Sequence, residues 1–455
     1  MRLTFLYTLS LLSVVGAAAR PQGIATRLDS TMRVAEANGF SGVIRVAVAG
    51  TTLLEKGYGL ANRAARIPIT ASTIVQIGSN TKDFTEVAIL QLVQAGKMKL
   101  SDSIGAYFAQ VPADKRAITI ADLLDHRAGF PLGVGGDFEP VSRAQLIGRA
   151  MSTPLLFPPG TRESYSNTGF SLLAAIIEQV TRTTYDVYVR DAILTPIGLR
   201  RTGFLIPAFR PADLAHGYSA TGIDQGTMLA KPHASDGPYW NLRGNGGMLS
   251  TVGDMHDFYQ ALFESDRLMA PAIRALRFNP NEPIGLAGSD GVNVFLYDRF
   301  PVKQVEIIIA STNAAMKAPV IRRELGKVLG LPEPDMGGET AMARPGGKPA
   351  PERVRAVISA LIHEINTNDG ASVRRFIAEH FAQDQGGPTV EERAQRVGAI
   401  HERLGDIIVE RVDLFDDGSV EATLKSSVHG TAVLLAAMDH VEPFLIHSLR
   451  VRVGG

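Results

Sequence analysis

The sequence of 455 residues contains no cysteine, which excludes disulfides, thiol catalysis, zinc–thiolate sites and iron–sulfur clusters. It also lacks an excess of either charge, because 46 Lys and Arg residues balance 46 Asp and Glu residues. This balance gives no support for a nucleic-acid partner or for an anionic membrane surface. With 45% hydrophobic and 20% charged residues, the composition is that of a globular protein with a large core.

Long apolar runs are also lacking beyond the N-terminal segment, so no stable membrane insertion is expected of the mature chain. Residues 1–19 combine Arg2, an apolar run over 3–15 and the small residues 16–19. This pattern is typical of a secretory signal peptide, and we expect cleavage after Ala19. The alternative is an uncleaved anchor or a buried N-terminal helix. Removal of a signal would leave the protein periplasmic or secreted.

Hydrophobic periodicity predicts an α+β domain over residues 20–330. Strands are expected at both ends of this domain and helices between them. The expected strands are 42–49, 53–58, 292–297 and 305–310, and the expected helices are 22–39, 85–95 and 168–181. The N- and C-terminal segments would therefore share one sheet.

Proline and glycine gather in residues 331–351, which indicates a linker. Residues 352–455 are predicted to form a second, small α+β domain in which helices precede strands. The expected helices are 352–366, 371–380 and 391–404, and the expected strands are 407–414, 420–426, 431–438 and 444–453. Asp416-Asp417-Gly418 is predicted to make the first hairpin turn.

Ser79 and Lys82 form an S-x-x-K motif at the mouth of the helix expected from Thr85. At a helix start, side chains three residues apart face the same way, and the helix dipole favours negative charge on Ser79. A neutral lysine amine can take the proton of a serine hydroxyl, but burial must first lower its pKa from about 10.4. The alternative is that Ser79 caps the helix and Lys82 is a solvated residue of its first turn.

Tyr165-Ser166-Asn167 follows a rigid Pro-Pro-Gly turn and precedes a helix. Tyrosine can relay a proton, and the asparagine amide can donate a hydrogen bond to a substrate carbonyl. The alternative is that Asn167 or Thr168 caps the helix and Tyr165 packs beneath it.

In order and spacing, these motifs resemble the serine β-lactamase and penicillin-binding-protein superfamily, specifically its class C-like branch, which includes esterases and D-amino-acid peptidases. The resemblance covers about residues 40–315, and further matching segments are 57–62, 118–129, 157–160, 195–199, 215–218 and 246–251. It implies a β-lactamase/transpeptidase-like fold, with an antiparallel sheet flanked by helices and an added helical region. It implies neither a cofactor nor a metal.

The resemblance also implies a role for each motif residue. Ser79 would be the acyl-accepting nucleophile, and Lys82 and Tyr165 would share general-base and general-acid work. Asn167 would position the substrate carbonyl. Gly288 would keep the edge strand open to the substrate, and the N–H of Ser289 would complete an oxyanion hole with the N–H of Ser79.

The third motif departs from the family pattern of Lys or His, then Thr or Ser, then Gly. The corresponding stretch is Leu286-Ala287-Gly288, so the cation and the hydroxyl are missing. We expect a substrate carboxylate to lose its usual partner, so that ordinary β-lactams and D-Ala-D-Ala peptides bind poorly. We also expect the proton of Lys82 to leave less readily, because a neighbouring cation would help to lower its pKa.

The histidines, Trp240 and the C-terminal domain show no catalytic motif. His126 is expected to make a structural hydrogen bond, and His216, His233 and His256 lack the spacing of a metal cluster. Trp240 either lines the substrate cleft or packs within a loop. The C-terminal domain resembles the NTF2-like or cystatin-like modules appended to secreted hydrolases, whose uses include self-association, covering the cleft or holding a ligand.

The sequence as a whole predicts an exported serine hydrolase that cleaves a small-molecule or peptide ester or amide through an acyl-enzyme on Ser79. One alternative is a weak β-lactamase or a cell-wall enzyme of the D-alanyl-D-alanine carboxypeptidase type. Another is a non-catalytic binding protein that kept the penicillin-recognising fold. Self-association through the C-terminal domain would make the protein a homo-oligomer.

Overall fold

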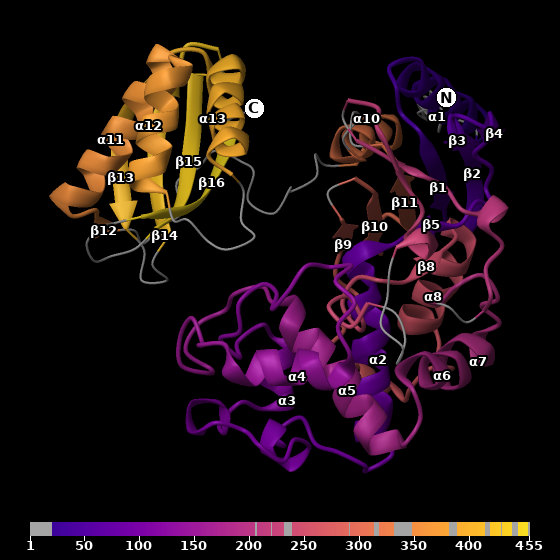
Figure 1. The fold of residues 1–455 in the computed structure, drawn as a ribbon. Coiled ribbons are helices and arrows are strands. Elements are labelled where there is room, and N and C mark those ends of the chain that lie inside the picture. The colour runs from indigo at the N-terminus through magenta and orange to yellow at the C-terminus, as the bar shows by residue number, and fades with distance from the viewer. Residues whose placement is uncertain are drawn as a thin grey trace, which may run out of the picture. The chain divides into compact units, whose positions relative to one another are not determined.

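The chain forms two compact units, which divide at residues 333 and 334 (Figure 1). A computed structural model describes residues 21–204, 207–219, 221–231, 239–290, 292–313, 318–331, 348–381, 389–414, 419–428, 430–438 and 445–453. The expected signal peptide, most of the expected linker, the 416–418 turn and His233 lie outside these residues.

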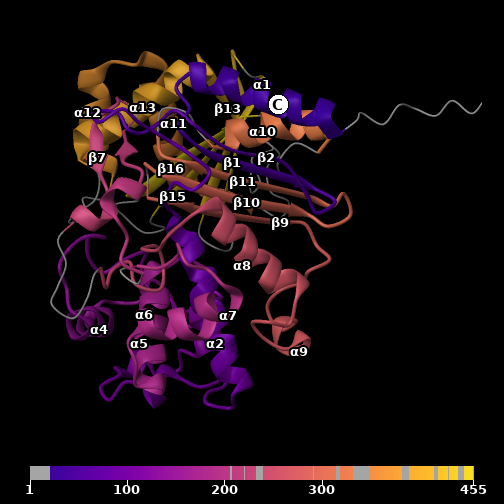
Figure 2. The same cartoon turned by 90° about the vertical axis from the view of Figure 1, so that its right-hand side faces the viewer.

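A five-stranded antiparallel sheet is the framework of the first unit (Figure 2). Its order is β2 (Thr51–Tyr58), β1 (Gly42–Val48), β11 (Val305–Ser311), β10 (Val294–Phe300) and β9 (Ile284–Ser289). Strands from both ends of the unit therefore share one sheet, which confirms the predicted α+β fold. β11 is buried along its whole length, as its unbroken apolar run favours.

β10 begins at Val294, two residues later than predicted. The carboxylate of Asp290 accepts the backbone N–H groups of Val292 and Asn293 at 2.9 and 2.6 Å. These two residues therefore belong to a side-chain-capped turn between β9 and β10 and not to the strand.

Helices cover both faces of this sheet (Figure 2). α1 (Pro21–Ala37) and α10 (Ala318–Leu329) lie on one face and contact each other, and α8 (Val252–Glu264) lies on the other face. The side chains between α1, α10 and the sheet form a core of their own, which includes Leu28, Met32, Ile44, Ile309 and Leu325.

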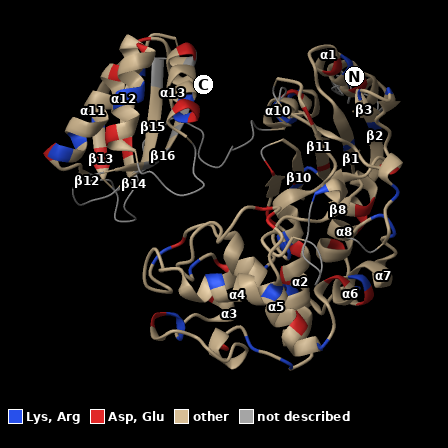
Figure 3. Cartoon of the chain, viewed as in Figure 1, with Lys and Arg blue, Asp and Glu red and all other residues tan. Residues whose placement is uncertain are grey.

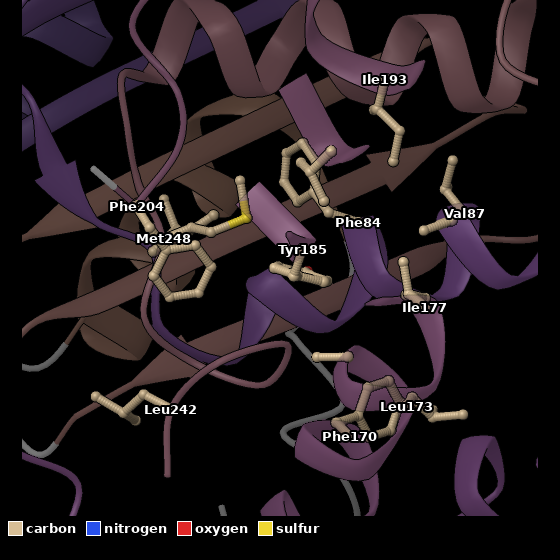
Figure 4. Close-up of a cluster of buried hydrophobic side chains, with 14 of the residues drawn as sticks. Phe84, Val87, Phe170, Leu173, Ile177, Tyr185, Ile193, Phe204, Leu242 and Met248 are labelled. Atoms are coloured by element: carbon tan, nitrogen blue, oxygen red, sulfur yellow. The ribbon is translucent and has the colours of Figure 1, made fainter. Parts of the chain in front are cut away.

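The helical region is built around α2 (Thr81–Gln94). The other helices are α3 (Ile120–Leu124), α4 (Arg143–Ser152), α5 (Asn167–Thr181), α6 (Tyr185–Val189), α7 (Thr195–Ile197) and α9 (Pro271–Arg274). α2 is apolar on most sides, so it is buried at the centre, where Phe84 and Val87 belong to the same hydrophobic cluster as Phe170 and Leu173 of α5 (Figure 4).

α2 begins four residues before the predicted start, so the sequence-based boundary at Thr85 is wrong. A 3₁₀ turn over Gly78–Asn80 leads directly into the helix. The Thr81 hydroxyl accepts the backbone N–H of Met248 at 3.1 Å and anchors this start. Lys82 consequently lies in the first helical turn.

Short ladders join distant segments of the first unit. They are β3 (Leu60–Asn62) with β4 (Ile67–Pro68), β6 (Gly217–Tyr218) with β7 (Asp224–Gly226), and β5 (Val75–Gln76) with β8 (Leu249–Ser250). The β5–β8 ladder continues in a bond from the Ile77 N–H to the Met248 carbonyl at 3.1 Å. It brings the segment around residues 245–250 beside the S-x-x-K motif.

The second unit has its own antiparallel sheet and its own core. The strands in sheet order are β12 (Lys348–Pro349), β13 (Ile407–Leu414), β14 (Ser419–Ser426), β15 (Gly430–Met438) and β16 (Ile446–Val453). The helices are α11 (Glu352–Thr367), α12 (Gly370–His380) and α13 (Val390–Leu404). Because β12 pairs with β13, this sheet already includes residues that composition assigns to a linker. The likeness to NTF2-like or cystatin-like modules stays a prediction.

Both signs of charge are interspersed along the elements of each unit (Figure 3). Among the described residues, no helix has both the length and the apolar composition needed to cross a bilayer.

Candidate active site

Ser79 lies in the 3₁₀ turn between β5 and α2, pressed against the end of edge strand β9. A Cβ on Gly78, whose φ is +52°, would meet the Ser289 nitrogen at 2.6 Å. A Cβ on Gly288 would meet the Ser79 nitrogen at 2.7 Å and the Ile77 carbonyl oxygen at 2.0 Å. Both glycines are therefore required by close approach of backbone to backbone, and the structure places Gly288 and Ser289 beside Ser79.

Lys82 directs its amine at Ser79 from the first turn of α2. Its Nζ lies 3.3 Å from Ser79 Oγ, 2.8 Å from Asn167 Oδ1 and 2.8 Å from the carbonyl oxygen of Asn245. Lys82 is only 6% exposed, and this burial lowers its pKa to about 7. Burial is the largest cause of this low pKa. The expectation that a cation on β9 would make the proton leave more readily stays a prediction.

The three contacts of Lys82 determine how a neutral amine must point. The amide oxygen of Asn167 and the main-chain oxygen of Asn245 can only accept hydrogen bonds. A neutral amine therefore uses its two N–H bonds on these oxygens, and its lone pair is left for the hydroxyl of Ser79. In this protonation state Lys82 is oriented as a base toward Ser79.

Tyr165 approaches Ser79 from the other side. Its hydroxyl donates to Ser79 Oγ at 2.7 Å, and burial at the site raises its pKa above the ordinary value near 10. The phenol therefore keeps its proton at neutral pH. Ser79 is partly exposed and Tyr165 is 46% exposed, so solvent reaches the serine hydroxyl.

His126 supports the segment that carries Tyr165, as the sequence predicts. Its Nδ1 accepts the backbone N–H of Ser166 at 3.1 Å, and its ring lies 4.5 Å from the ring of Tyr165. Burial lowers the pKa of His126 to about 4, so the ring is neutral over the physiological range and acts as an acceptor.

Asn167 is the first residue of α5, and the cap of that helix is Ser166. The Ser166 side chain accepts the N–H of Gly169 at 3.3 Å and donates to the carbonyl oxygen of Pro131 at 2.7 Å. The alternative in which Asn167 or Thr168 caps the helix is therefore wrong, and the side chain of Asn167 is free to bind Lys82.

The altered third motif lies on β9. Leu286 and Gly288 are two residues apart on the strand, so they share the face that Gly288 turns toward Ser79. The side chain of Leu286 is partly buried against the main core. An apolar side chain thus occupies the strand position where the family pattern has a cation.

A family model described as Beta-lactamase matches residues 28–300, which is more than half of the chain. The chain belongs to the beta-lactamase family. Members of this family are serine hydrolases. The match includes Ser79, Lys82, Tyr165, Asn167 and β9.

Relatives of this beta-lactamase family member match it over part of its length. A Salmonella typhimurium protein, whose name proposes a D-alanyl-D-alanine carboxypeptidase, is 30% identical over 239 residues, or 45% of this chain and 55% of that one. The chain therefore spans about half the length of the relatives that it matches in this way.

Two solved structures share the fold. A beta-lactamase/D-alanine carboxypeptidase from Pseudomonas syringae has a TM-score of 0.58 at 19% identity, over 68% of this chain and 99% of that one. An octameric penicillin-binding protein homologue from Pyrococcus abyssi has a TM-score of 0.57 at 21% identity, over 92% of this chain and 91% of that one.

Sequence reasoning missed one contact of this beta-lactamase family site and a polar pair next to it in the sequence. The carbonyl of Asn245 is a main-chain acceptor, so it cannot be predicted from the residue type at this position. Asp83 and Tyr259 share a 2.7 Å hydrogen bond across 176 residues of sequence. The only signal for Asp83 was its place directly after Lys82.

The remaining candidates lie apart from the Ser79 contacts. His216 bonds Asp224 at 2.9 Å, and His256 bonds Glu306 at 2.6 Å. Within the described ranges, no three potential metal-ligating side chains come together. Trp240 is 1% exposed and packs in the core, which favours the packed-loop interpretation.

Replacing Gly288 with alanine is expected to lower kcat/KM for hydrolysis by roughly 10²–10³, the effect of losing one donor to the oxyanion, here the N–H of Ser289. The new methyl group would overlap the Ile77 carbonyl oxygen and push β9 away from the Ser79 nitrogen. Steady-state kinetics check this, with Gly285→Ala on the same strand as the control. A Gly288→Ala enzyme with parental kcat/KM would show that β9 does not border the reacting carbonyl.

Proposed function

We propose that this beta-lactamase family member is an exported serine hydrolase that cleaves an ester or amide through an acyl-enzyme on Ser79. The observation that carries the proposal is the convergence of the Tyr165 hydroxyl and the Lys82 amine on Ser79 Oγ, at 2.7 and 3.3 Å. A protonated phenol and a lysine with a pKa of about 7 form a donor and a base on one hydroxyl.

Acylation would proceed as the Ser79 O–H bond breaks and its proton passes to Lys82 Nζ. Oγ bonds to the carbonyl carbon, and the oxyanion accepts hydrogen bonds from the N–H groups of Ser79 and Ser289. The leaving group departs with the proton that Lys82 took from Ser79, relayed by Tyr165, and the amide of Asn167 orients the acyl carbonyl. Water then attacks the acyl-enzyme ester and gives a proton to the neutral amine of Lys82, which passes it to Ser79 Oγ as the ester bond breaks and the acid is released.

Leu286 favours substrates without a carboxylate beside the scissile bond. A carboxylate placed along β9 would meet an apolar side chain and lose a charge-assisted hydrogen bond. We therefore propose an uncharged ester or amide as substrate. The names of the relatives favour a D-alanyl-D-alanine carboxypeptidase as the second candidate, and its substrate ends in the group that Leu286 disfavours.

The test is covalent labelling of the purified protein. A fluorophosphonate should add one equivalent of mass, mapped to the peptide that holds Ser79, and p-nitrophenyl acetate should be turned over. The label should be absent in Ser79→Ala. No adduct and no turnover in the parent protein would favour the non-catalytic binding protein instead.

Leu286→Lys is expected to increase the rate of acylation by benzylpenicillin about tenfold, because a cation on this face of β9 can pair with the penicillin carboxylate. The parent protein should react with benzylpenicillin slowly. The matched control is Ala287→Lys, which adds the same charge to the exposed face of the strand. Equal gains in both variants would show that general electrostatic attraction, and not the position of Leu286, limits the reaction.

We further propose that the chain self-associates through its second unit. The support is the match to an octameric homologue over 92% of the chain, including residues of that unit. The molar mass of the full-length protein in solution, measured by light scattering, checks the proposal, and a monomer over the accessible concentration range contradicts it.

A further inference from the structure

A polar cluster lies directly behind the reacting side chains, and the proposed mechanism does not use it. Tyr259 of α8 donates its hydroxyl proton to Asp83 at 2.7 Å and accepts a hydrogen bond from the Asn80 amide at 2.8 Å. Asn80 directly follows Ser79, and Asp83 directly follows Lys82. One phenol therefore holds both residues that come after the reacting side chains.

The phenol is fixed by its surroundings. Tyr259 is fully buried, and its ring stacks on that of Tyr297 of β10 with centroids 3.8 Å apart. Asn80 is 2% exposed. Such a buried and hydrogen-bonded group has one orientation, so Asp83 has a permanent donor on its carboxylate.

The cluster also touches the other wall of the site. The same Cβ on Gly288 that would meet the Ser79 nitrogen at 2.7 Å would meet Asn80 Oδ1 at 2.6 Å. Asn80 therefore lies against the Ser79 turn and β9 at once, and a shift of Tyr259 would be transmitted to both.

We propose that Asp83, held by Tyr259, is a positioning residue that supplies the counter-charge for the Lys82 ammonium formed when Ser79 loses its proton. This inference rests on the proposed function. In the acylation step the Ser79 O–H bond breaks, the proton and a positive charge appear on Nζ, and Oγ bonds to the carbonyl carbon. An ionised Asp83, the next residue along α2, stabilises this charge because Lys82 is buried.

The electrostatics of the pair agree with this role. Burial lowers the pKa of Lys82 and raises the pKa of Asp83 well above its usual range, whereas the charge of each partner acts in the opposite direction on the other. The hydrogen bond from Tyr259 favours the ionised carboxylate. Removal of the Asp83 charge would therefore lower the pKa of Lys82.

Other charged groups act on Lys82 or Asp83, but they are either paired with an opposite charge or lie outside the cluster of Tyr259, Asp83 and Asn80. On α2, Glu86 raises the pKa of Asp83 but is paired with Arg277 at 2.5 Å, and Arg277 also contacts Asp125. Asp137, in the loop before α4, adds a smaller contribution that raises the pKa of Lys82.

Two further groups face Lys82 from the segments before α5 and after α3. They are Tyr165, which keeps its proton, and His126, which is neutral. Among these groups, Asp83 makes the largest charge contribution to Lys82.

The test compares Asp83→Asn with the parent in the pH dependence of p-nitrophenyl acetate acylation. The amide keeps an acceptor for Tyr259 but carries no charge. We expect the acidic limb to move about one pH unit lower, because the amine of Lys82 stays neutral at lower pH. The plateau rate should fall roughly three- to tenfold, because the weaker base lacks its counter-charge.

Two variants separate this role from a structural one. Asp257→Asn removes an exposed carboxylate from α8 and should leave both the limb and the plateau unchanged. Tyr259→Phe removes the donor, raises the pKa of Asp83 and should move the limb in the same direction by less. It also serves as the test if Asp83→Asn does not fold. A fall in rate with an unmoved acidic limb in Asp83→Asn would overturn the inference.

A titration that does not need catalysis distinguishes this inference from the proposed function. The ¹³Cε signal of Lys82, assigned with Lys82→Met in lysine-labelled protein, reports its protonation directly. A titration midpoint that is lower in Asp83→Asn than in the parent supports the charge coupling even if no ester is turned over. Absence of ester turnover would contradict the hydrolase proposal alone. Equal midpoints would overturn the inference in either case.

Discussion

Ser79→Ala is expected to lower kcat/KM for p-nitrophenyl acetate by a factor on the order of 10⁴–10⁶, because it removes the atom to which the acyl group bonds. Backbone N–H groups and the binding surface would stay in place, so the remaining rate should reflect stabilisation of the oxyanion alone. The change deletes one small, partly exposed hydroxyl, and the turn that carries it is shaped by Gly78. Steady-state kinetics with a thermal unfolding scan check both points.

The matched control is Ser72→Ala, which removes an exposed hydroxyl seven residues earlier in the chain. It should keep parental kinetics. A Ser79→Ala protein that retains more than a few per cent of the parental rate would place the nucleophile elsewhere.

The sequence predicts an element of the fold correctly where the hydrophobic pattern within that element determines its structure. The apolar run of β11 predicts a central strand, and the amphipathic spacing of residues 22–39 predicts α1. The start of α2 was not predictable in this way. It depends on the Thr81 hydroxyl and the Met248 N–H, which a short ladder brings together from distant segments.

The same distinction applies to the site. Ser79, Lys82 and Tyr165 were identified because their side-chain types carry the chemistry and their spacing is characteristic. The structure adds what makes Lys82 a base, namely burial together with two carbonyl acceptors. Those acceptors and the burial depend on the packing of α2 between α5 and the 239–247 segment, and no local pattern encodes that packing.

Tyr165 and Lys82 contact the same hydroxyl, and the structure gives them different tasks. Burial favours the neutral form of both groups, because it lowers the pKa of Lys82 to about 7 and raises the pKa of Tyr165. Above pH 7 the phenol is therefore a donor and the amine an acceptor. With Leu286 in place of a cation on β9, no positive charge from that strand position favours a phenolate. Lys82 is therefore the group expected to limit activity at low pH.

Lys82→Met is expected to lower kcat/KM by roughly 10³–10⁴, the effect of losing a general base. In the parent, kcat/KM should fall as pH drops through about 7, because the protonated amine has no lone pair for the Ser79 proton. It should reach a plateau above that value, since the raised pKa of Tyr165 delays any alkaline loss. The residual activity of Lys82→Met should lack the acidic limb, and pH–rate profiles measure both effects.

Lys82→Arg decides whether the amine acts as a base or only as a positive charge. Arginine keeps the charge and the donors for Asn167 and Asn245, but its guanidinium does not lose a proton in this pH range. If proton transfer to residue 82 is required, Lys82→Arg should be as inactive as Lys82→Met at every pH. Activity in Lys82→Arg well above that of Lys82→Met would assign the base to Tyr165 instead, because the retained cation would then be promoting a phenolate.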